Sequence, residues 1–205
     1  MEKSIKQVQE DKPNKIFDIK KYFIDNIAIV SEANPVFAFF EVFISNLSVK
    51  TSLNSRILGT FITFIGFGTI FSKGRDMWRK IFRVNQKTNE KIQAFHDFIY
   101  AGILNLVTMP PTYALSQYMA NEELDMKKIL TASVIAAIVS GLNGPFVGYA
   151  IDIYRDLSNI KECERTFYKK LKINNKSVKK IGIYALTLSS LALISTIYYI
   201  KSRFE

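Results

Sequence analysis

The sequence has one cysteine and one histidine among its 205 residues. A lone Cys163 cannot form a disulfide framework within the chain, and with His96 it makes no metal-ligand pattern. No pairing of a nucleophile with a general base stands out either, so an intramembrane enzyme has no residue pattern to support it. We therefore expect no cofactor, no metal site and no enzymatic activity.

Charged residues are nearly absent from five long stretches, although the chain carries 28 Lys and Arg and 18 Asp and Glu. Each stretch has the roughly 20 residues that a helix needs to cross a hydrocarbon core of about 30 Å. Because a chain in lipid must satisfy its backbone hydrogen bonds internally, the sequence predicts an all-α polytopic membrane protein with five transmembrane helices. The predicted crossings are residues 22–47, 53–72, 98–120, 129–151 and 181–200.

These crossings divide the chain into four parts. Residues 1–21 form a polar cytoplasmic head, and residues 22–157 hold the first four helices as one membrane domain. A basic cytoplasmic linker follows at 158–180, and residues 181–205 make an additional transmembrane helix with a short outer tail.

Lysine and arginine are distributed unevenly between the two sides of the predicted bundle. Residues 1–21, 73–96 and 155–180 together hold 22 of the 28 basic residues, whereas the opposite side receives six. Basic loops stay on the cytoplasmic side of a membrane. The chain is therefore predicted to lie in a cell membrane with its N-terminus in the cytoplasm and its C-terminus outside.

The net charge of +10 could reflect membrane topology, as above, or binding to nucleic acid. Such binding needs a basic surface with aromatic side chains between the charges. Here the basic residues follow the membrane topology, and the 16 Phe and 10 Tyr lie largely in the apolar stretches. Tyr154, Tyr198 and Tyr199 fit an aromatic belt at the interface. We expect the lipid bilayer as a partner, and no nucleic acid.

Prolines and Arg-Asp pairs recur along the first four predicted helices. From Pro35 to Arg75 is 40 residues, and from Pro111 to Arg155 is 44, a difference of about one helical turn. The recurrence suggests a parallel repeat of two-helix units, an arrangement found in transporters. The alternative is that prolines and glycines are simply common in membrane helices.

Pro35 and the Pro110–Pro111 pair are expected to break their helices near the membrane centre, because proline lacks the backbone N–H. Broken helices line cavities more often than they face lipid. Gly144 and Gly148 have the GxxxG spacing that lets helices approach closely. We expect that approach within the chain, with a dimer interface as the alternative.

Two acidic residues lie deep in the first predicted crossing. A bare charge at such depth costs several kcal/mol unless it is paired, hydrated or protonated. Glu41 lies late in the first crossing and Arg56 early in the second, so the two are at similar depth and can pair. Glu32 is the deepest, and a carboxyl that changes protonation there is a candidate for proton coupling.

A second set of charges lies at the cytoplasmic ends of the first four predicted helices. It includes Asp25, Arg75, Asp76, Asp152 and Arg155. Snorkelling to the lipid headgroups explains any one of these charges taken alone. Together they bring both signs of charge to one layer, as the recognition of a zwitterion requires.

Several of these residues belong to one pattern of fixed spacing along the chain. The pattern comprises Asp25, Glu41-Val42-Phe43, Ser55-Arg56, Gly74-Arg75-Asp76 and Gly144-x-x-x-Gly148-Tyr149-x-x-Asp152-x-x-Arg155. In these residues the chain resembles the L-alanine exporter family of small four-helix inner-membrane proteins, over about residues 23 to 157. It departs from that family in its fifth predicted helix, its longer polar head and its longer 73–96 loop.

The resemblance implies a secondary transporter that exports L-alanine or a similar small neutral amino acid from the cytoplasm by proton exchange. Asp25 and Asp152 are the candidate acceptors for the substrate's ammonium group, and Arg75 and Arg155 are the candidate ligands of its carboxylate. The full set of predicted transport residues is Asp25, Glu41, Arg56, Arg75, Asp76, Tyr149, Asp152 and Arg155, with Glu41 and Arg56 as the outer gate and Glu32 for proton coupling.

The four crossings of the membrane domain make a thin wall around a substrate path, so we expect a homodimer.

The alternative function is a membrane anchor or assembly protein with no transport activity, whose charges only hold its helices together.

Overall fold

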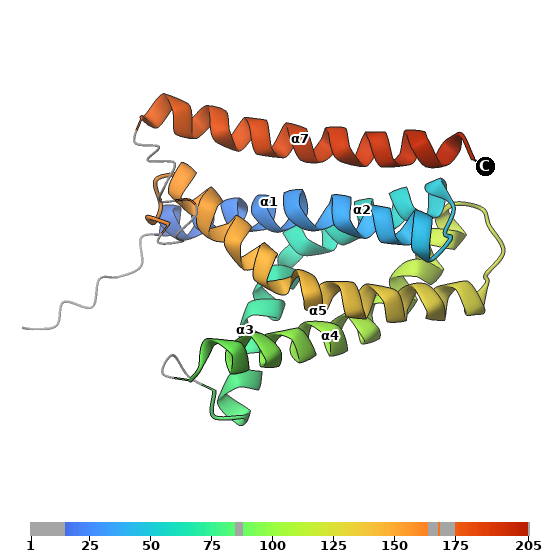
Figure 1. The fold of residues 1–205 in the computed structure, drawn as a ribbon, viewed down its shortest axis with the longest axis horizontal. Helices are drawn as coiled ribbons and strands as arrows, with labels where there is room; N and C mark the ends of the chain where they lie inside the picture. Colours follow the sequence, from blue (N-terminus) through green and yellow to red (C-terminus); the bar gives the residue numbers. More distant parts are fainter. Residues whose placement is uncertain (1–14, 85–87, 164–167, 169–174, 205) are drawn as a thin grey trace, which may run out of the picture.

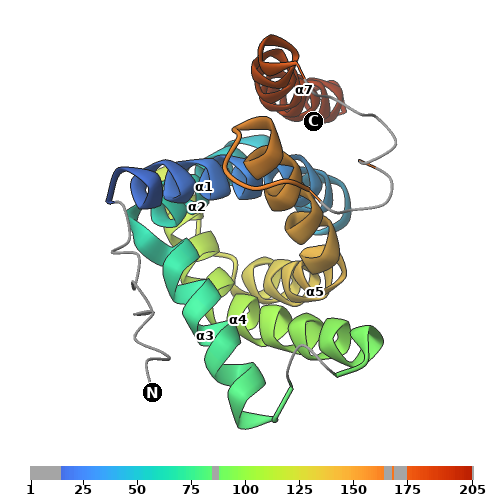
Figure 2. The same cartoon turned by 90° about the vertical axis from the view of Figure 1, so that its left-hand side faces the viewer.

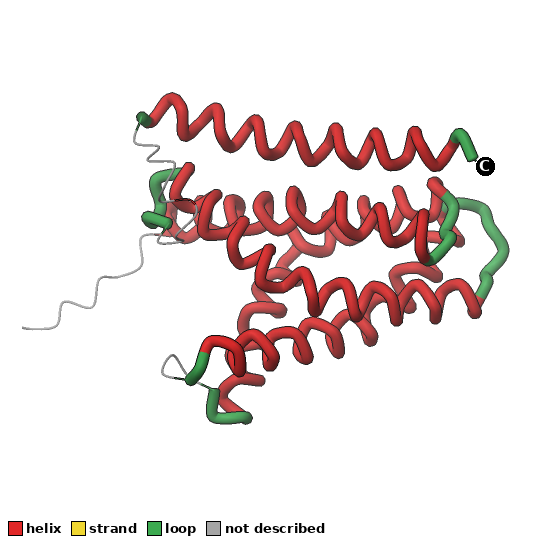
Figure 3. Tube along the Cα trace, in the orientation of Figure 1, coloured by secondary structure: helices red, strands yellow, loops and turns green. Residues whose placement is uncertain are grey.

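The computed structural model describes residues 15–84, 88–163, 168 and 175–204, without the side chains of 15–18, 69–73, 75–76, 90 and 93–94. Every regular element in these residues is a helix (Figure 3). The prediction of an all-α fold is confirmed.

The first predicted crossing is a continuous helical element. Helix α1 (Lys15–Phe39) runs through Pro35 and passes directly into the π-helix η1 (Phe40–Ile44). The prediction that proline breaks this helix is wrong, because proline removes one backbone donor while its fixed φ remains compatible with the helix. Helix α4 (Glu90–Met119) likewise continues through its Pro110–Pro111 pair.

The second predicted crossing, residues 53–72, is divided instead. Helix α2 (Val49–Ile62) is followed by the π-helix η2 (Thr63–Phe67) and then by α3 (Gly68–Ile81). Inside η2, Gly66 has a φ of 130°, a backbone conformation that residues with a Cβ atom rarely adopt. The helix axis changes direction there, and α3 turns away from the line of α2 (Figures 1 and 2).

Helix α4 packs along α5 (Met126–Leu157), and glycines bring the two together. A Cβ atom on Gly141 would lie only 2.5 Å from the ring of Phe98. A Cβ on Gly102 would lie 3.4 Å from the backbone oxygen of Ala137. The closest approach of α4 and α5 therefore depends on these two glycines.

Helix α7 (Lys176–Ser202) lies along α1 on the outside of the other helices (Figures 1 and 2). Its first turn is tied to the end of α5, because Lys179 Nζ lies 2.5 Å from Asp156 Oδ1. Further along, the hydroxyls of Tyr154 and Thr187 are 3.1 Å apart. Polar contacts thus fix α7 on the helices that precede it.

Four helices in the described part of the chain are long and apolar enough to cross a membrane. They are Ile19–Ile44, Phe95–Met119, Met126–Leu157 and Lys176–Ser202. These correspond to the first, third, fourth and fifth predicted crossings. Because of the kink at Gly66, a crossing by residues 53–72 stays a prediction, and so does the two-unit repeat.

The outer surface is rich in large apolar side chains, among them Val107 at 69% exposure and Phe146 at 66%. The largest cluster of buried apolar residues in the described part of the chain lies where α1, α4 and α5 meet. Its buried members are Phe37, Leu47, Tyr113, Ile129, Ala132, Ala136 and Val139. An apolar exterior over a partly polar interior is the arrangement that a hydrocarbon solvent favours.

Candidate functional site

A cavity of about 640 Å³ lies between α1, α2, α4 and α5. This volume is within the range of about 300–1,000 Å³ found for small-ligand sites. The polar side chains in its wall include Asp25, Asn26, Asn34, Arg56, Asn105, Asn143, Asp152 and Arg155. Three of the predicted cytoplasmic charges therefore border one space.

A bidentate contact in the cavity wall joins Asp25 on α1 to Arg155 in the last turn of α5. Arg155 Nε donates a hydrogen bond to Asp25 Oδ1 at 2.6 Å, and Arg155 Nη2 donates to Asp25 Oδ2. About a fifth of each side chain is exposed. Asp152 borders the same cavity one turn earlier on α5. Of the five charges predicted to lie in one layer, Asp25, Asp152 and Arg155 thus border the same cavity.

A second bidentate pair of the same kind lies elsewhere. Arg79 Nε donates to Asp97 Oδ1 at 2.8 Å, and Arg79 Nη2 donates to Asp97 Oδ2. The two side chains are 27% and 25% exposed, similar to Asp25 and Arg155. Neither residue belongs to the cavity wall. A variant of Arg79 therefore serves as a control, because it removes an Arg–Asp contact of similar exposure that lies outside the cavity wall.

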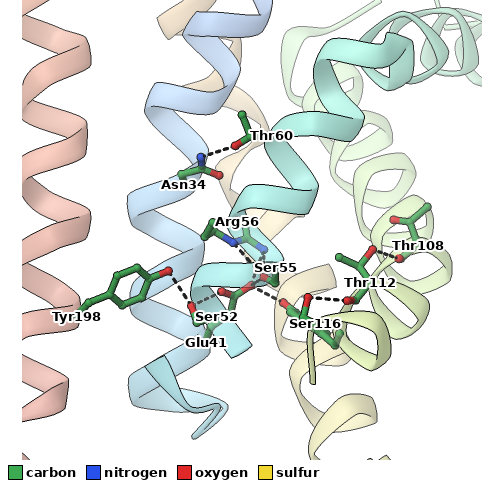
Figure 4. Close-up of polar contacts among 11 residues, drawn as sticks. Asn34, Glu41, Ser52, Ser55, Arg56, Thr60, Thr108, Thr112, Ser116 and Tyr198 are labelled. Atoms are coloured by element: carbon green, nitrogen blue, oxygen red, sulfur yellow. Dashed lines mark hydrogen bonds and ion pairs between the residues drawn. The ribbon is translucent and has the colours of Figure 1, made fainter. Parts of the chain in front are cut away.

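Glu41 is at the centre of a buried polar cluster (Figure 4). Arg56 Nη2 lies 2.5 Å from Glu41 Oε1, as the sequence predicted, and the side chains are 8% and 2% exposed. Ser52 donates to Glu41 Oε2 at 2.6 Å, while Ser55 and Tyr113 each donate to Oε1 at 2.9 Å. The carboxylate therefore accepts from one cation and three hydroxyls, which offset its loss of hydration.

Helix α7 reaches this cluster through Tyr198. The hydroxyls of Tyr198 and Ser52 are 3.0 Å apart (Figure 4). Because the single hydroxyl hydrogen of Ser52 is donated to Glu41, Tyr198 is the donor to Ser52. Tyr198 is 9% exposed and Tyr154 is 3% exposed, so the assignment of both to an aromatic belt is wrong. Tyr199, at 59%, remains consistent with it.

Glu32 on α1 contacts α5 at Asn143, the residue before the first glycine of the GxxxG pair. Asn143 Nδ2 donates to Glu32 Oε2 at 2.8 Å, so the deepest carboxyl has an amide partner. Gly144 and Gly148 border the cavity, and a Cβ on Gly144 would meet no atom within 4 Å. The expected close helix approach at Gly144 within the chain is therefore wrong.

The other predicted site residues lie apart from the cavity or outside the description. The side chains of Arg75 and Asp76 are not among the described residues. Tyr149 lies outside the cavity wall, and its hydroxyl accepts a hydrogen bond from the backbone N–H of Tyr168 at 3.1 Å. Burial and the nearby charge of Asp156 raise the pKa of Tyr168 to about 12.

Sequence reasoning missed the amides and hydroxyls of the interior. Asn26, Asn34 and Asn105 border the cavity but were not singled out. A signal was present, because polar side chains in apolar stretches are costly and face the protein interior. The spacing of Ser52, Ser55 and Arg56 at i, i+3 and i+4 also places them on one face of α2. Tyr113 and Tyr198 carried no comparable signal.

Comparison with known proteins identifies one family. The family described as "AlaE: L-alanine exporter" matches residues 14–161. No curated protein and no solved structure matches the chain. The described residues contain no group of three or more His, Cys, Asp or Glu side chains arranged to hold a metal ion. The match ends before α7.

Proposed function

Because the chain belongs to the L-alanine exporter family, we propose that it is a secondary transporter that carries L-alanine, or a similar small neutral amino acid, out of the cytoplasm in exchange for protons. Membership makes it a multi-pass membrane exporter and not an enzyme. The observation that supports the transport site is the cavity between α1, α2, α4 and α5, which has Asp25, Asp152 and Arg155 in its wall.

These three residues offer a complementary partner for each end of a zwitterion. The substrate's ammonium group takes the carboxylates of Asp25 and Asp152, and its carboxylate takes the guanidinium of Arg155. Binding then replaces the Asp25–Arg155 contact with two contacts to substrate, so neither partly buried charge is left without a partner. Arg75, Asp76 and Tyr149 complete this cytoplasmic set in the proposal.

Glu41 and Arg56 form the outer gate. From Asp25 to Glu41 the chain advances 16 residues along a nearly continuous helix, or roughly 24 Å at the rise of an α-helix. The two ion pairs therefore lie at different depths, and Arg56 borders the cavity at its own level. Separation of Glu41 from Arg56 opens the outer path, while separation of Asp25 from Arg155 opens the cytoplasmic one.

Glu32 couples proton movement to transport. It lies on α1 between the two ion pairs, and its carboxylate accepts a hydrogen bond from the neutral amide of Asn143. Because the amide of Asn143 carries no charge, a proton on Glu32 neutralises its site, whereas Glu41 is already neutralised by Arg56. Proton binding at Glu32 therefore alternates with substrate binding at Arg155.

The topology follows the distribution of basic residues. The bent α2–η2–α3 segment makes the second crossing, which brings the total to five, so that the N-terminus is cytoplasmic and the C-terminus lies outside. The two helix units, α1 with α2 and α4 with α5, move relative to each other to give alternating access. Gly66 is the hinge of this movement in place of the prolines, and two copies of the chain form a homodimer.

The test is uptake of labelled L-alanine into proteoliposomes that hold the purified protein, with and without a pH gradient. Asp152→Asn and Arg155→Ala are expected to abolish transport while the protein still inserts and folds. The matched control is Arg79→Ala, which removes an Arg–Asp contact of similar exposure outside the cavity and should preserve transport. Full transport by both cavity variants would remove the site assignment.

A cellular test separates export from the anchor alternative. A cell without an alanine exporter should be arrested by alanine-containing dipeptides, and expression of this chain should restore growth. An anchor or assembly protein with no transport activity would give no rescue, even when it is present in the membrane.

A further inference from the structure

Asn26 presents an unused hydrogen-bond donor in the cavity. The residue is 2% exposed, it belongs to the cavity wall, and its Nδ2 atom has no hydrogen-bond partner among the described residues. A buried amide N–H without an acceptor costs free energy, so such groups are rare, and in a cavity wall the acceptor can come from the molecule that the cavity binds. The position therefore points to a ligand atom that accepts hydrogen bonds.

The other asparagines of the cavity already use their donors. Asn34 Nδ2 donates to Thr60 at 3.0 Å. Asn105 Nδ2 donates to Ser140 at 2.7 Å, and Asn143 Nδ2 donates to Glu32 at 2.8 Å. Asn26 differs from these neighbours in having its amide nitrogen available.

The backbone opposite Asn26 is shaped to hold its amide in place. A Cβ atom on Gly68, at the start of α3, would lie 2.7 Å from Asn26 Oδ1, which is closer than real contacts allow. Gly68 also borders the cavity. A glycine at this position thus leaves room for the amide group of Asn26 and limits where that group can lie.

We propose that Asn26 Nδ2 is part of a carboxylate subsite, and that it donates a hydrogen bond to the carboxylate of the transported amino acid. This inference rests on the proposed function and adds a specificity-determining residue to it. Arg155 borders the same cavity and supplies the positive charge, while Asn26 adds a directional donor without a further charge. Asn26 therefore favours a carboxylate over a carboxamide, which presents one acceptor oxygen and no negative charge.

The test compares binding of L-alanine and L-alaninamide to the purified full-length protein by titration calorimetry. Asn26→Leu keeps the approximate size of the side chain and removes the donor. We expect L-alanine binding to weaken roughly 10- to 100-fold, as for the loss of a hydrogen bond to a charged group. L-alaninamide binding should change less than about twofold. Equal weakening of both ligands, or of neither, would overturn the proposal.

Two further variants guard against a general loss of folding. Gly68→Ala leaves Asn26 in the sequence but displaces its amide, so it should reproduce the selective loss of L-alanine binding. Asn54→Leu is the matched control, because Asn54 lies outside the cavity wall and its Nδ2 already donates to the backbone oxygen of Ser116 at 3.3 Å. It should lower thermal stability without changing the ratio of the two affinities. A selective loss in Asn54→Leu and none in Gly68→Ala would refute the role of Asn26.

A second ligand pair separates this inference from the proposed function. L-lactate and L-lactamide differ in the carboxylate but carry no ammonium group. If the wild-type protein moved no L-alanine in liposomes, yet its preference for L-lactate over L-lactamide depended on Asn26, the exporter proposal would fail and the carboxylate subsite would stand. If transport occurred but Asn26→Leu changed neither preference, only the subsite would fail.

Discussion

Glu41 and Arg56 provide the sharpest test of how this fold tolerates charge in its interior. Glu41→Gln keeps the shape of the side chain but leaves the guanidinium of Arg56, 8% exposed, without its counter-ion. Removal of one member of a buried pair typically destabilises a protein by about 3–5 kcal/mol. We expect Glu41→Gln to lie in this range. Arg56→Met should cost less, because the three hydroxyls on Glu41 remain as donors.

The double variant is the decisive member of the series. Glu41→Gln with Arg56→Met leaves no charge in the cluster, so its cost should be smaller than the sum of the two single costs by about 2–3 kcal/mol. The free energy of unfolding is measured by SDS titration in mixed micelles. Fluorescence of Trp78, the single tryptophan of the chain, and far-UV circular dichroism report the transition.

A surface pair serves as the control for this cycle. Lys128 Nζ lies 3.9 Å from Asp125, and the side chains are 52% and 42% exposed. Lys128→Met should therefore change the free energy of unfolding by about 0.5 kcal/mol or less. If the effects of Glu41→Gln and Arg56→Met were additive, or if either matched the cost of Lys128→Met, the cluster would not be the coupled unit that we infer.

Three further outcomes are expected. Tyr198→Phe removes the donor from α7 to Ser52 and should cost about 1 kcal/mol in the free energy of unfolding without abolishing transport; an unchanged midpoint would mean that this contact does not hold α7. Gly66→Ala places a Cβ at a φ of 130° and should lower stability by more than about 1 kcal/mol in the same titration, and a neutral effect would contradict the kink. Burial and the charge of Asp156 raise the pKa of Tyr168 to about 12, so its contribution to stability is complete below pH 10.0, the ordinary pKa of tyrosine, and is lost as the pH rises through 12. The difference in tyrosinate absorbance between wild type and Tyr168→Phe measures this ionisation. A pKa near 10.0 would refute the combined effect of burial and Asp156.

The sequence determined the features that depend on the composition of whole segments. The length of the apolar stretches predicted an all-α membrane fold, because a backbone in lipid must satisfy its own hydrogen bonds. Four of the five stretches are helices that can cross a membrane. The spaced pattern from Asp25 to Arg155 was sufficient to identify the family, and the similar depth of Glu41 and Arg56 predicted their contact.

The tertiary structure decided how polar groups from distant segments meet. Asp25 and Arg155 are 130 positions apart, and Tyr198 reaches a cluster on η1 and α2 from a helix beyond the family match. Such contacts depend on helix rotation and on where a kink falls, and periodicity does not specify either one. Proline was a poor guide to the kink, because a helix packed on its neighbours tolerates one missing hydrogen bond, whereas the backbone conformation of Gly66 changes the helix direction itself.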